Sequence, residues 1–472
     1  MNDILAHRAP RRKLCAERSK RLLLSTSVIA RALFLILLLP LVIACTGSPT
    51  PTETPNAIDQ IDLKGPIALT LWHTQTGANG AALQMMADDF NKTNQYQITV
   101  KLEYQGDYTQ LYQKTLAAIN ANALPDMSVA NESFVADYMK ATPSPVVDLG
   151  PYVDSKKYGL TRASVDDIFG AYLATNRFAQ FGDKLLSFPL TKSVLVMYQN
   201  DDVLKELGMS SPKTWDEFEK VASAAKKVSA DGKTITRYGW AVIADPSTFN
   251  GWVLSRGGRL MADDNKTVKW DGAEGLASLQ LVDRCIKAQW CYAPKSFDYY
   301  ADFGSGKAAF VMDSSLARPS YRAAMKEPKP NWRIVSIPQQ DASTARTVAY
   351  GANIAAFSST PQKQLASWVF MKWFADTTRT AMWSIASSYL PVRKSAANDA
   401  TLKNSWSSTD PQGKEAFDQS GTSQPEPNVR GQQDIRTVVA DGITAILTGR
   451  DTPEHALQLA STKANQILKD NQ

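Results

Sequence analysis

The pattern of apolar and polar positions after residue 66 alternates between two periods. Residues 67–75 (IALTLWHTQ) and 97–104 (QITVKLEY) place apolar side chains at every second position, as a strand with one buried face does. The segments that follow them, 77–94 and 107–124, place apolar side chains three and four positions apart, as an amphipathic helix does. Strands that alternate with helices predict an α/β fold with a largely parallel sheet.

The middle of the chain indicates a second α/β unit. Residues 185–200 read as one extended segment interrupted by Pro189, long enough to pass from one domain to the next. A helix is expected soon after it, because Thr214 and Glu217 have the spacing of a capping box.

The last third of the chain predicts another extended region, residues 333–359, followed by one tryptophan-rich helix over 361–387. Two further helices should close the chain. They are joined at Gly449, and Thr452 caps the second of them with Pro453 at its first position. Three tryptophans recur at helical spacing in the tryptophan-rich segment and are assigned to the core: Trp368, Trp373 and Trp383.

A separate apolar run, residues 22–44, follows a basic leader and ends at Cys45. The part after Arg31 is only about a dozen residues long, which suits a signal peptide and is shorter than the roughly 20 residues of a spanning helix. Val42-Ile43-Ala44-Cys45 resembles the lipobox of bacterial lipoproteins. We therefore interpret residues 1–44 as a lipoprotein signal peptide and Cys45 as the lipid attachment site, with an uncleaved helix as the alternative.

Either interpretation places the body of the protein outside the cytoplasm. Residues 45–65 are rich in Pro, Thr and Ser and are expected to form a flexible tether. The formal charge of +6 comes from the leader, where eight Arg and Lys outnumber Asp3 and Glu17, so the rest of the chain is formally neutral. A nucleic-acid partner is not expected, because no basic surplus remains.

The residues that commonly carry catalysis or bind metals are sparse. Beyond Cys45 only Cys285 and Cys291 remain, and outside the cytoplasm they could form a small disulfide ring, with two buried free thiols as the alternative. Beyond the leader only His73 and His455 remain, which excludes a zinc site built on several imidazoles. We expect no metal site.

Nucleotide and cofactor motifs are absent or in the wrong context. Residues 303–310 (FGSGKAAF) fit G-x-G-x-x-A, but here the pattern predicts a helix before the glycines and the strand 308–312 after them. A dinucleotide site needs the reverse order. With no G-x-S-x-G motif and no phosphate-binding loop, we expect no cofactor and no catalytic residue.

Several ordered segments of residues 66–472 resemble the extracytoplasmic solute-binding proteins of ABC importers, in the carbohydrate-binding group. They include LWHTQTGANGAALQMMADDFNKTN, YQGDYTQLYQKTLAAINANALPDM, LLSFPLTKSVLVMYQNDDVLKELGMSSPKTWDEF, FGSGKAAFVMDSS, YGANIAAFSS, SYLPVRKSA and TGRDTPEHALQLA. The glycerol-3-phosphate-binding members are the most similar, particularly in WHTQTG, YQGDY and SYLPV.

The resemblance implies a two-lobed α/β fold of the class II periplasmic binding protein type, with a ligand cleft between lobes that hinge shut. It implies an N-terminal lobe of residues 66–190 plus 346–392 and a C-terminal lobe of 191–345 plus 393–472. The chain would cross between the lobes at about 186–195, 343–353 and 392–400.

The resemblance also assigns ligand contacts in the first half of the chain. Tyr108 would offer a ring and a hydroxyl, and Glu132 would accept hydrogen bonds from polyol hydroxyls. The alternatives are a surface tyrosine and a solvated glutamate. Thr191 and Ser193 fall where relatives contact phosphate, although Lys192 stands between them.

Further contacts are assigned in the second half. Asp313 stands beside Ser314 where relatives have small hydroxyl residues, and an aspartate repels phosphate, which favours a neutral sugar. The backbone of Gly351 can approach a ligand closely. Three larger side chains complete the set: Tyr389, Arg436 as a bidentate donor to a polar ligand or else a surface salt bridge, and Trp252 as a stacking surface.

These assignments imply a monomeric, non-catalytic receptor, anchored by lipid to the outer side of the cell membrane. It would capture a carbohydrate or a polyol phosphate and deliver it to the membrane subunits of an ABC permease. The alternatives are an extracytoplasmic carbohydrate-active enzyme and a sugar-binding protein associated with a sensor.

Overall fold

The structure, a computed structural model, describes residues 56–471. The proposed signal peptide and the lipid site Cys45 lie outside the described residues. Within residues 56–471, no helix is both long enough and apolar enough to span a membrane. Residues 57–60 differ from the expected tether, because they form a short 3-10 helix that buries Ile58 against the folded body.

The first sheet has the strand order β2-β1-β3-β14-β6. The strands β1 (Ile67–His73), β2 (Ile98–Tyr104) and β3 (Met127–Ala130) are parallel, as the alternating pattern predicts. The strands β14 (Asn353–Ala356) and β6 (Phe188–Pro189) come from later in the chain and extend this sheet with antiparallel pairing.

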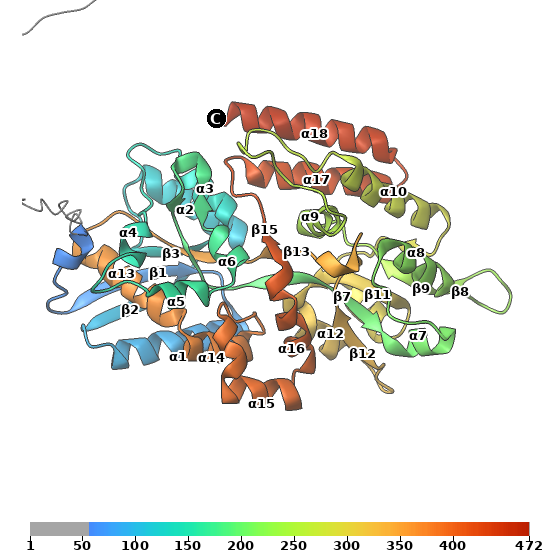
Figure 1. Ribbon diagram of the computed structural model, residues 1–472, viewed down its shortest axis with the longest axis horizontal. Coiled ribbons are helices and arrows are strands. Elements are labelled where there is room, and N and C mark those ends of the chain that lie inside the picture. The colour runs from blue at the N-terminus through green and yellow to red at the C-terminus, as the bar shows by residue number, and fades with distance from the viewer. Residues whose placement is uncertain (1–55, 472) are drawn as a thin grey trace, which may run out of the picture. The chain divides into compact units, whose positions relative to one another are not determined.

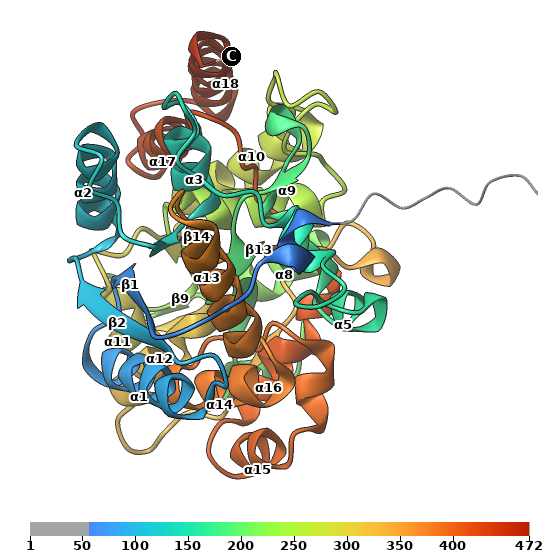
Figure 2. The same cartoon turned by 90° about the vertical axis from the view of Figure 1, so that its left-hand side faces the viewer.

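Helices cover both faces of the first sheet (Figures 1 and 2). The helices α1 (Gly77–Thr93) and α13 (Pro361–Phe374) pack with β1 and β2 in one hydrophobic cluster. The helices α2 (Tyr108–Asn120) and α3 (Glu132–Tyr138) form a second cluster with Ala130 and with residues of the β14 segment.

The second sheet is built around β7 (Ser193–Asn200), whose residues are all buried. Along β7, Val194, Val196 and Tyr198 face one hydrophobic cluster, whereas Leu195 and Met197 face another. The other strands of this sheet are β8 (Lys227–Val228), β9 (Ile235–Ala241), β10 (Cys291–Tyr292), β11 (Ala308–Ser314), β12 (Trp332–Val335), β13 (Thr347–Tyr350) and β15 (Ser423–Pro425).

Helices also cover both faces of the second sheet. The cluster around Leu195 and Met197 includes α8 (Trp215–Ala224), α9 (Pro246–Ser255), α10 (Ala273–Lys287), α17 (Gln432–Leu447) and α18 (Pro453–Asp470). On the other face lie α11 (Asp298–Gly304), α12 (Arg318–Ala324) and α16 (Pro411–Asp418).

Shorter elements connect these layers. They are α4 (Gly150–Val153), α5 (Arg162–Asp166), α6 (Gly170–Ala174), β4 (Arg177–Phe178), β5 (Lys184–Leu185), α7 (Asp201–Leu207), α14 (Thr377–Ser387) and α15 (Ala400–Ser408). The 3-10 helices are η1 (Ala57–Gln60), η2 (Ala179–Phe181), η3 (Ser315–Ala317), η4 (Ala342–Thr344), η5 (Lys394–Asn398) and η6 (Ser420–Thr422).

Several local predictions are confirmed. Thr214 and Glu217 form a capping box at the start of α8. Thr452 caps α18, and Pro453 takes its first position. The glycine-rich segment ends α11, and β11 follows it, so the order of elements is the opposite of a dinucleotide site.

Two expectations about secondary structure are wrong. The sheets are mixed and not largely parallel, because strands that pass from one sheet to the other enter antiparallel to their neighbours. The tryptophan-rich segment forms two helices, α13 and α14. The chain breaks between them because the Asp376 side chain accepts a hydrogen bond from the Arg379 N–H and starts a new helix there.

Two segments of the chain pass side by side from one sheet to the other. The first joins β6 to β7 through Thr191, and the second joins β13 to β14 through Gly351. The Thr191 N–H donates to the Ala352 carbonyl at 3.0 Å. A Cβ on Gly351, whose φ is +122°, would lie 2.3 Å from the Thr191 carbonyl oxygen, so only glycine fits this crossing.

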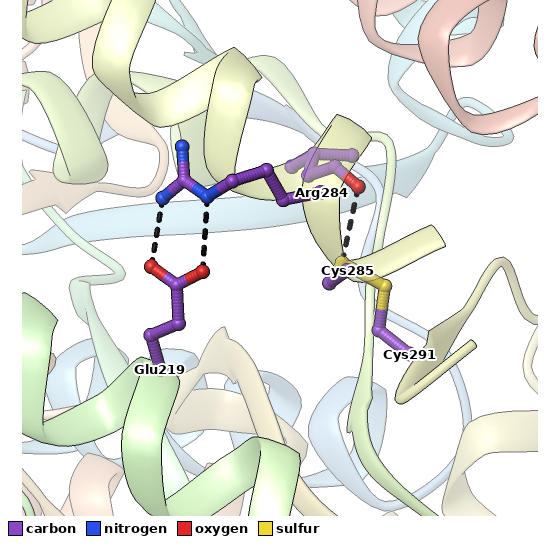
Figure 3. The surroundings of a disulfide bond; sticks show 5 residues. Glu219, Arg284, Cys285 and Cys291 are labelled. Carbon is purple, nitrogen blue, oxygen red and sulfur yellow. Dashed lines mark hydrogen bonds and ion pairs between the residues drawn. A yellow bond between two sulfur atoms is a disulfide. The ribbon is translucent and has the colours of Figure 1, made fainter. Parts of the chain in front are cut away.

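A disulfide joins Cys285, near the end of α10, to Cys291 at the start of β10, with 5.3 Å between their Cα atoms (Figure 3). Beside it, the Arg284 side chain on α10 forms a two-point ion pair with Glu219 on α8. The disulfide and the ion pair both fasten the end of α10 to its neighbours.

We expect reduction of the unfolded protein to raise its intact mass by two hydrogen atoms, because Cys285 and Cys291 are bridged. Replacing both with serine should lower the free energy of unfolding by about 2 kcal/mol, since the closed loop is short. Mass spectrometry and urea unfolding measure the two effects. An unchanged mass after reduction would mean that the thiols are free.

Candidate functional site

A cavity of about 320 Å³ lies beside the two crossing segments. This volume is at the small end of the roughly 300 to 1,000 Å³ of ligand pockets, so the cavity suits a small solute. It is lined by Tyr108, Asn131, Glu132, Ser133, Ser193, Ser247, Ser314, Leu316, Tyr350, Gly351, Ala352, Tyr389, Glu426 and Arg436. Hydroxyl groups, aromatic rings and charged groups predominate among these side chains.

Glu132 is the first residue of α3 and only 5% exposed. Within the described part of the chain, its Oε2 atom has no hydrogen-bond partner. Burial raises the pKa of this carboxyl, and the charge of Glu426 raises it further, whereas the Lys192 ammonium acts in the opposite direction. A buried acceptor without a partner is costly, so Glu132 is poised to accept a hydrogen bond from a bound molecule.

Lys192 is buried between the crossing segments. Its ammonium donates to the Gly351 carbonyl at 3.0 Å and to Asn353 Oδ1 at 2.6 Å. Burial lowers the pKa of Lys192, and the charges of Glu132 and Glu426 counteract that effect. Lys192, which separates Thr191 from Ser193 in the sequence, therefore links the two crossing segments by buried hydrogen bonds.

Arg436 reaches the cavity from α17 and forms an ion pair with Glu426, which follows β15. Its Nη1 atom lies 3.2 and 3.1 Å from the two Glu426 carboxylate oxygens and donates to Ser247 Oγ at 3.0 Å. Glu426 is 5% exposed and also accepts from Asn250 Nδ2 at 2.8 Å. Arg436 thus both lines the cavity and forms a salt bridge.

Tyrosines supply the aromatic surface of the cavity. Tyr108 begins α2, where Asp107 and Gln110 form a capping box, and its hydroxyl lies next to those of Tyr389 and Thr191. Burial raises the pKa of Tyr108 and of Tyr389, which keeps both phenols neutral. Neutral phenols can donate and accept hydrogen bonds.

The cavity brings together most of the residues that the sequence assigned to a site. Tyr108, Glu132, Ser193, Ser314, Gly351, Tyr389 and Arg436 all line it. Thr191 lies just behind the lining, fully buried, with its hydroxyl within 3.2 Å of the Ala352 carbonyl.

The structure differs from the sequence-based expectation at Trp252 and Asp313. Trp252 is 1% exposed and packs in the core against Trp240, with its indole N–H directed at Met312, because α9 faces the second sheet there. Its ring therefore has no free face for a sugar. The Asp313 carboxylate turns toward the Tyr321 hydroxyl at 3.2 Å, and only its neighbour Ser314 lines the cavity.

Sequence reasoning missed Glu426, Ser247 and Tyr350. Glu426 lies between two prolines in QPEPN, where nothing nearby in the sequence signals a site. Its partners Asn250 and Arg436 reach it only through the fold. Within residues 56–471, no three His, Cys, Asp or Glu side chains are grouped as a metal site requires.

Comparison with known families identifies the chain. Residues 85–410 match the family model described as bacterial extracellular solute-binding protein. The chain belongs to this family. The cavity beside the crossing segments is lined by residues from elements associated with both sheets.

Curated relatives cover most of this solute-binding protein. The periplasmic sn-glycerol-3-phosphate-binding protein UgpB of Pectobacterium atrosepticum is 25% identical over 425 residues, which are 85% of this chain and 91% of the relative. UgpB of Escherichia coli K12 is 24% identical over 424 residues, 85% and 92% of the two chains.

Solved structures share the fold. The cyclic α-maltosyl-1,6-maltose-binding protein of Arthrobacter globiformis has a TM-score of 0.73 at 20% identity, covering 86% of this chain and all of its own. UgpB of Mycobacterium tuberculosis, solved with glycerophosphocholine, has a TM-score of 0.68 at 20% identity, covering 86% and 99%. The predicted two-lobed periplasmic binding protein fold is thus confirmed.

We expect Arg436→Ala to lower the free energy of unfolding of this solute-binding protein by about 3 kcal/mol, because Glu426 would stay buried without its cationic partner. Urea unfolding measures the loss. Arg284→Ala is the matched control. It breaks the ion pair with Glu219 at a half-exposed position and should cost under about 1 kcal/mol. Equal losses for the two variants would contradict the buried pair.

Burial raises the pKa of Asp313 to about 7, which makes the folded protein hold a proton that the unfolded chain releases near pH 4. This contribution to stability is complete below about pH 4 and is lost as the pH rises through about 7. We therefore expect Asp313→Asn to match the wild type at pH 4 and to exceed its free energy of unfolding at pH 8 by about 1 to 2 kcal/mol.

Urea unfolding at the two pH values checks this expectation. The control is Asp341→Asn, because Asp341 is exposed and hydrogen bonds from Ser343 lower its pKa. That variant should gain no stability over the wild type as the pH rises. A constant difference between Asp313→Asn and the wild type at both pH values would show that Asp313 titrates normally.

Proposed function

We propose that this solute-binding protein captures a small sugar or a glycerol-phosphate-type polyol outside the cytoplasm and delivers it to an ABC permease. The observation that carries the proposal is the unpartnered, buried Oε2 of Glu132 in a cavity of hydroxyl and tyrosine side chains. Such a set recognises hydroxyl groups, which donate to the carboxylate and accept from serine and tyrosine hydroxyls. The names of the relatives, which bind glycerol phosphate or maltose-type sugars, support the same solute class.

Each side of the cavity has a distinct role in this proposal. Glu132 and Tyr108 hold the solute from the first sheet's side, while Arg436 and Ser247 hold it from the helices of the second sheet. Gly351 lines the cavity between them. Tyr389 contributes a ring on which the apolar face of a sugar can lie.

Two lobes would open and close around this solute. They are the lobes proposed from the sequence, residues 66–190 plus 346–392 and residues 191–345 plus 393–472. In the structure, hydrogen bonds join the α3 region to the residues just before α17. The Gly431 N–H donates to Asp137 Oδ1 at 3.3 Å, and Arg430 Nη2 donates to the Met139 carbonyl at 3.4 Å. We propose that these contacts break on opening.

The proposal includes how the receptor is held at the membrane and what it does there. Lipid on Cys45 would hold a monomer at the outer side of the membrane, next to the permease. The protein would act without catalysis, as a receptor whose cavity side chains bind and orient a solute. Capture and release would be its whole activity.

A thermal-shift screen of residues 46–472 tests the proposal, because a solute that binds only the folded state raises the melting temperature. We expect a shift with a sugar or a glycerol phosphate among mono- and disaccharides, short oligosaccharides, sn-glycerol 3-phosphate and glycerophosphodiesters. For the solute found, Glu132→Gln should weaken binding about tenfold in calorimetry, since an acceptor oxygen is replaced by an amide nitrogen, which cannot accept a hydrogen bond. The control Glu274→Gln lies outside the cavity and should bind normally. No shift with any member of the screen would refute the proposal.

A further inference from the structure

The cations in and beside the cavity are already engaged by other groups of the protein. Among the described residues that line it, Arg436 is the only cation, and its Nη1 atom is shared between the two carboxylate oxygens of Glu426 and the Ser247 hydroxyl. Asp245 lies 4.0 Å from Nη2 of the same guanidinium. Arg436 therefore faces two carboxylates before any solute enters.

The second cation near the cavity is also engaged. Lys192 lies beneath the lining and donates to the Gly351 carbonyl and to Asn353. Glu132 faces the cavity as a further carboxylate. The acids around the cavity thus at least balance the cations, which leaves no positive charge for an anionic group.

Glu426 is held in place. Pro425 and Pro427 flank it and restrict its backbone, and Asn250 Nδ2 donates to its carboxylate at 2.8 Å. A phosphate group, with a charge near −2 at neutral pH, would approach the Arg436 guanidinium next to this buried carboxylate, which is bonded to Nη1, and next to Asp245, which lies 4.0 Å from Nη2. Repulsion between like charges is strong in such a desolvated place.

We propose that Glu426 excludes phosphate from the cavity, so that the solute is an uncharged polyhydroxy compound such as a sugar or a polyol. The inference rests on the proposed function and narrows its solute class. Hydroxyl groups suit the pair as it stands, because a hydroxyl can donate to the Glu426 carboxylate and accept from the Arg436 guanidinium at once. Without the charge of Glu426, Arg436 and the Ser247 hydroxyl would together form an anion site.

The experiment compares the affinity of the wild type and of Glu426→Gln for sn-glycerol 3-phosphate and inorganic phosphate by calorimetry. We expect no measurable binding to the wild type and at least a tenfold gain in affinity for glycerol 3-phosphate in Glu426→Gln. The gain should vanish in Glu426→Gln/Arg436→Gln, which removes the guanidinium. Glu426→Asp keeps the charge and should continue to exclude phosphate.

Glu219→Gln is the matched control. Glu219 also forms a two-point pair with an arginine, Arg284 (Figure 3). It is not among the residues that line the cavity. That variant should bind no phosphate. If Glu426→Gln gains no affinity for either probe, or if Glu219→Gln gains as much, Glu426 is not the excluding residue and the inference is overturned.

If Glu426→Gln fails to fold, the solute preference of the wild type tests the inference. Binding of a phosphate ester to the wild type as tightly as a neutral sugar would overturn the inference and leave the proposed receptor function intact. Binding of neutral sugars without phosphate esters would support both. A wild type that binds neither class would refute the proposed function itself, and the inference with it.

Discussion

The close approach of two backbone segments is the constraint on which the rest of the structure depends. Thr191 and Gly351 lie on neighbouring passages between the sheets, and a side chain at position 351 would meet the Thr191 carbonyl at 2.3 Å. Because the segments touch, the Lys192 ammonium can hold the second one by the Gly351 carbonyl and Asn353. Residues on either side of this junction, such as Ser193, then line a single cavity. The position of the site is therefore a consequence of how the chain crosses.

Burial explains the chemistry of that cavity. Taking a carboxylate and a guanidinium out of water is unfavourable unless they pair, and Glu426 and Arg436 do so with two hydroxyl or amide partners, Ser247 and Asn250. Glu132 has no such partner, and its raised pKa reflects that position. The cavity thus combines one satisfied charge pair with one unsatisfied acceptor. This combination suits a solute that brings hydroxyl groups and no charge of its own.

Much of the fold could be predicted from the sequence because it depends on local signals. The alternation in β1, the helical period of α1 and the capping box at Thr214 each involve residues close together in the chain. The antiparallel entry of β14 could not be predicted, since its partners β3 and β6 are distant in sequence. The same holds for the site: Tyr108, Glu132 and Arg436 came from resemblance to a family, whereas Glu426 acquires its role only through Asn250 and Arg436.

If Cys45 carries lipid, the docking of residues 57–60 on the folded body shortens the segment that would tether the protein to the membrane. Asn56 already contacts the folded body, because its side chain donates to the Pro151 carbonyl, whereas the composition placed the start of the body at residue 66. With lipid on Cys45, the chain from there to Asn56 could extend at most about 40 Å. The receptor would then search a thin layer above the bilayer, where confinement raises its effective concentration at the permease far above its average in the compartment. With such an anchor, each residue that packs on the body would shorten the tether, so the contacts of residues 56–60 would influence how often receptor and transporter meet.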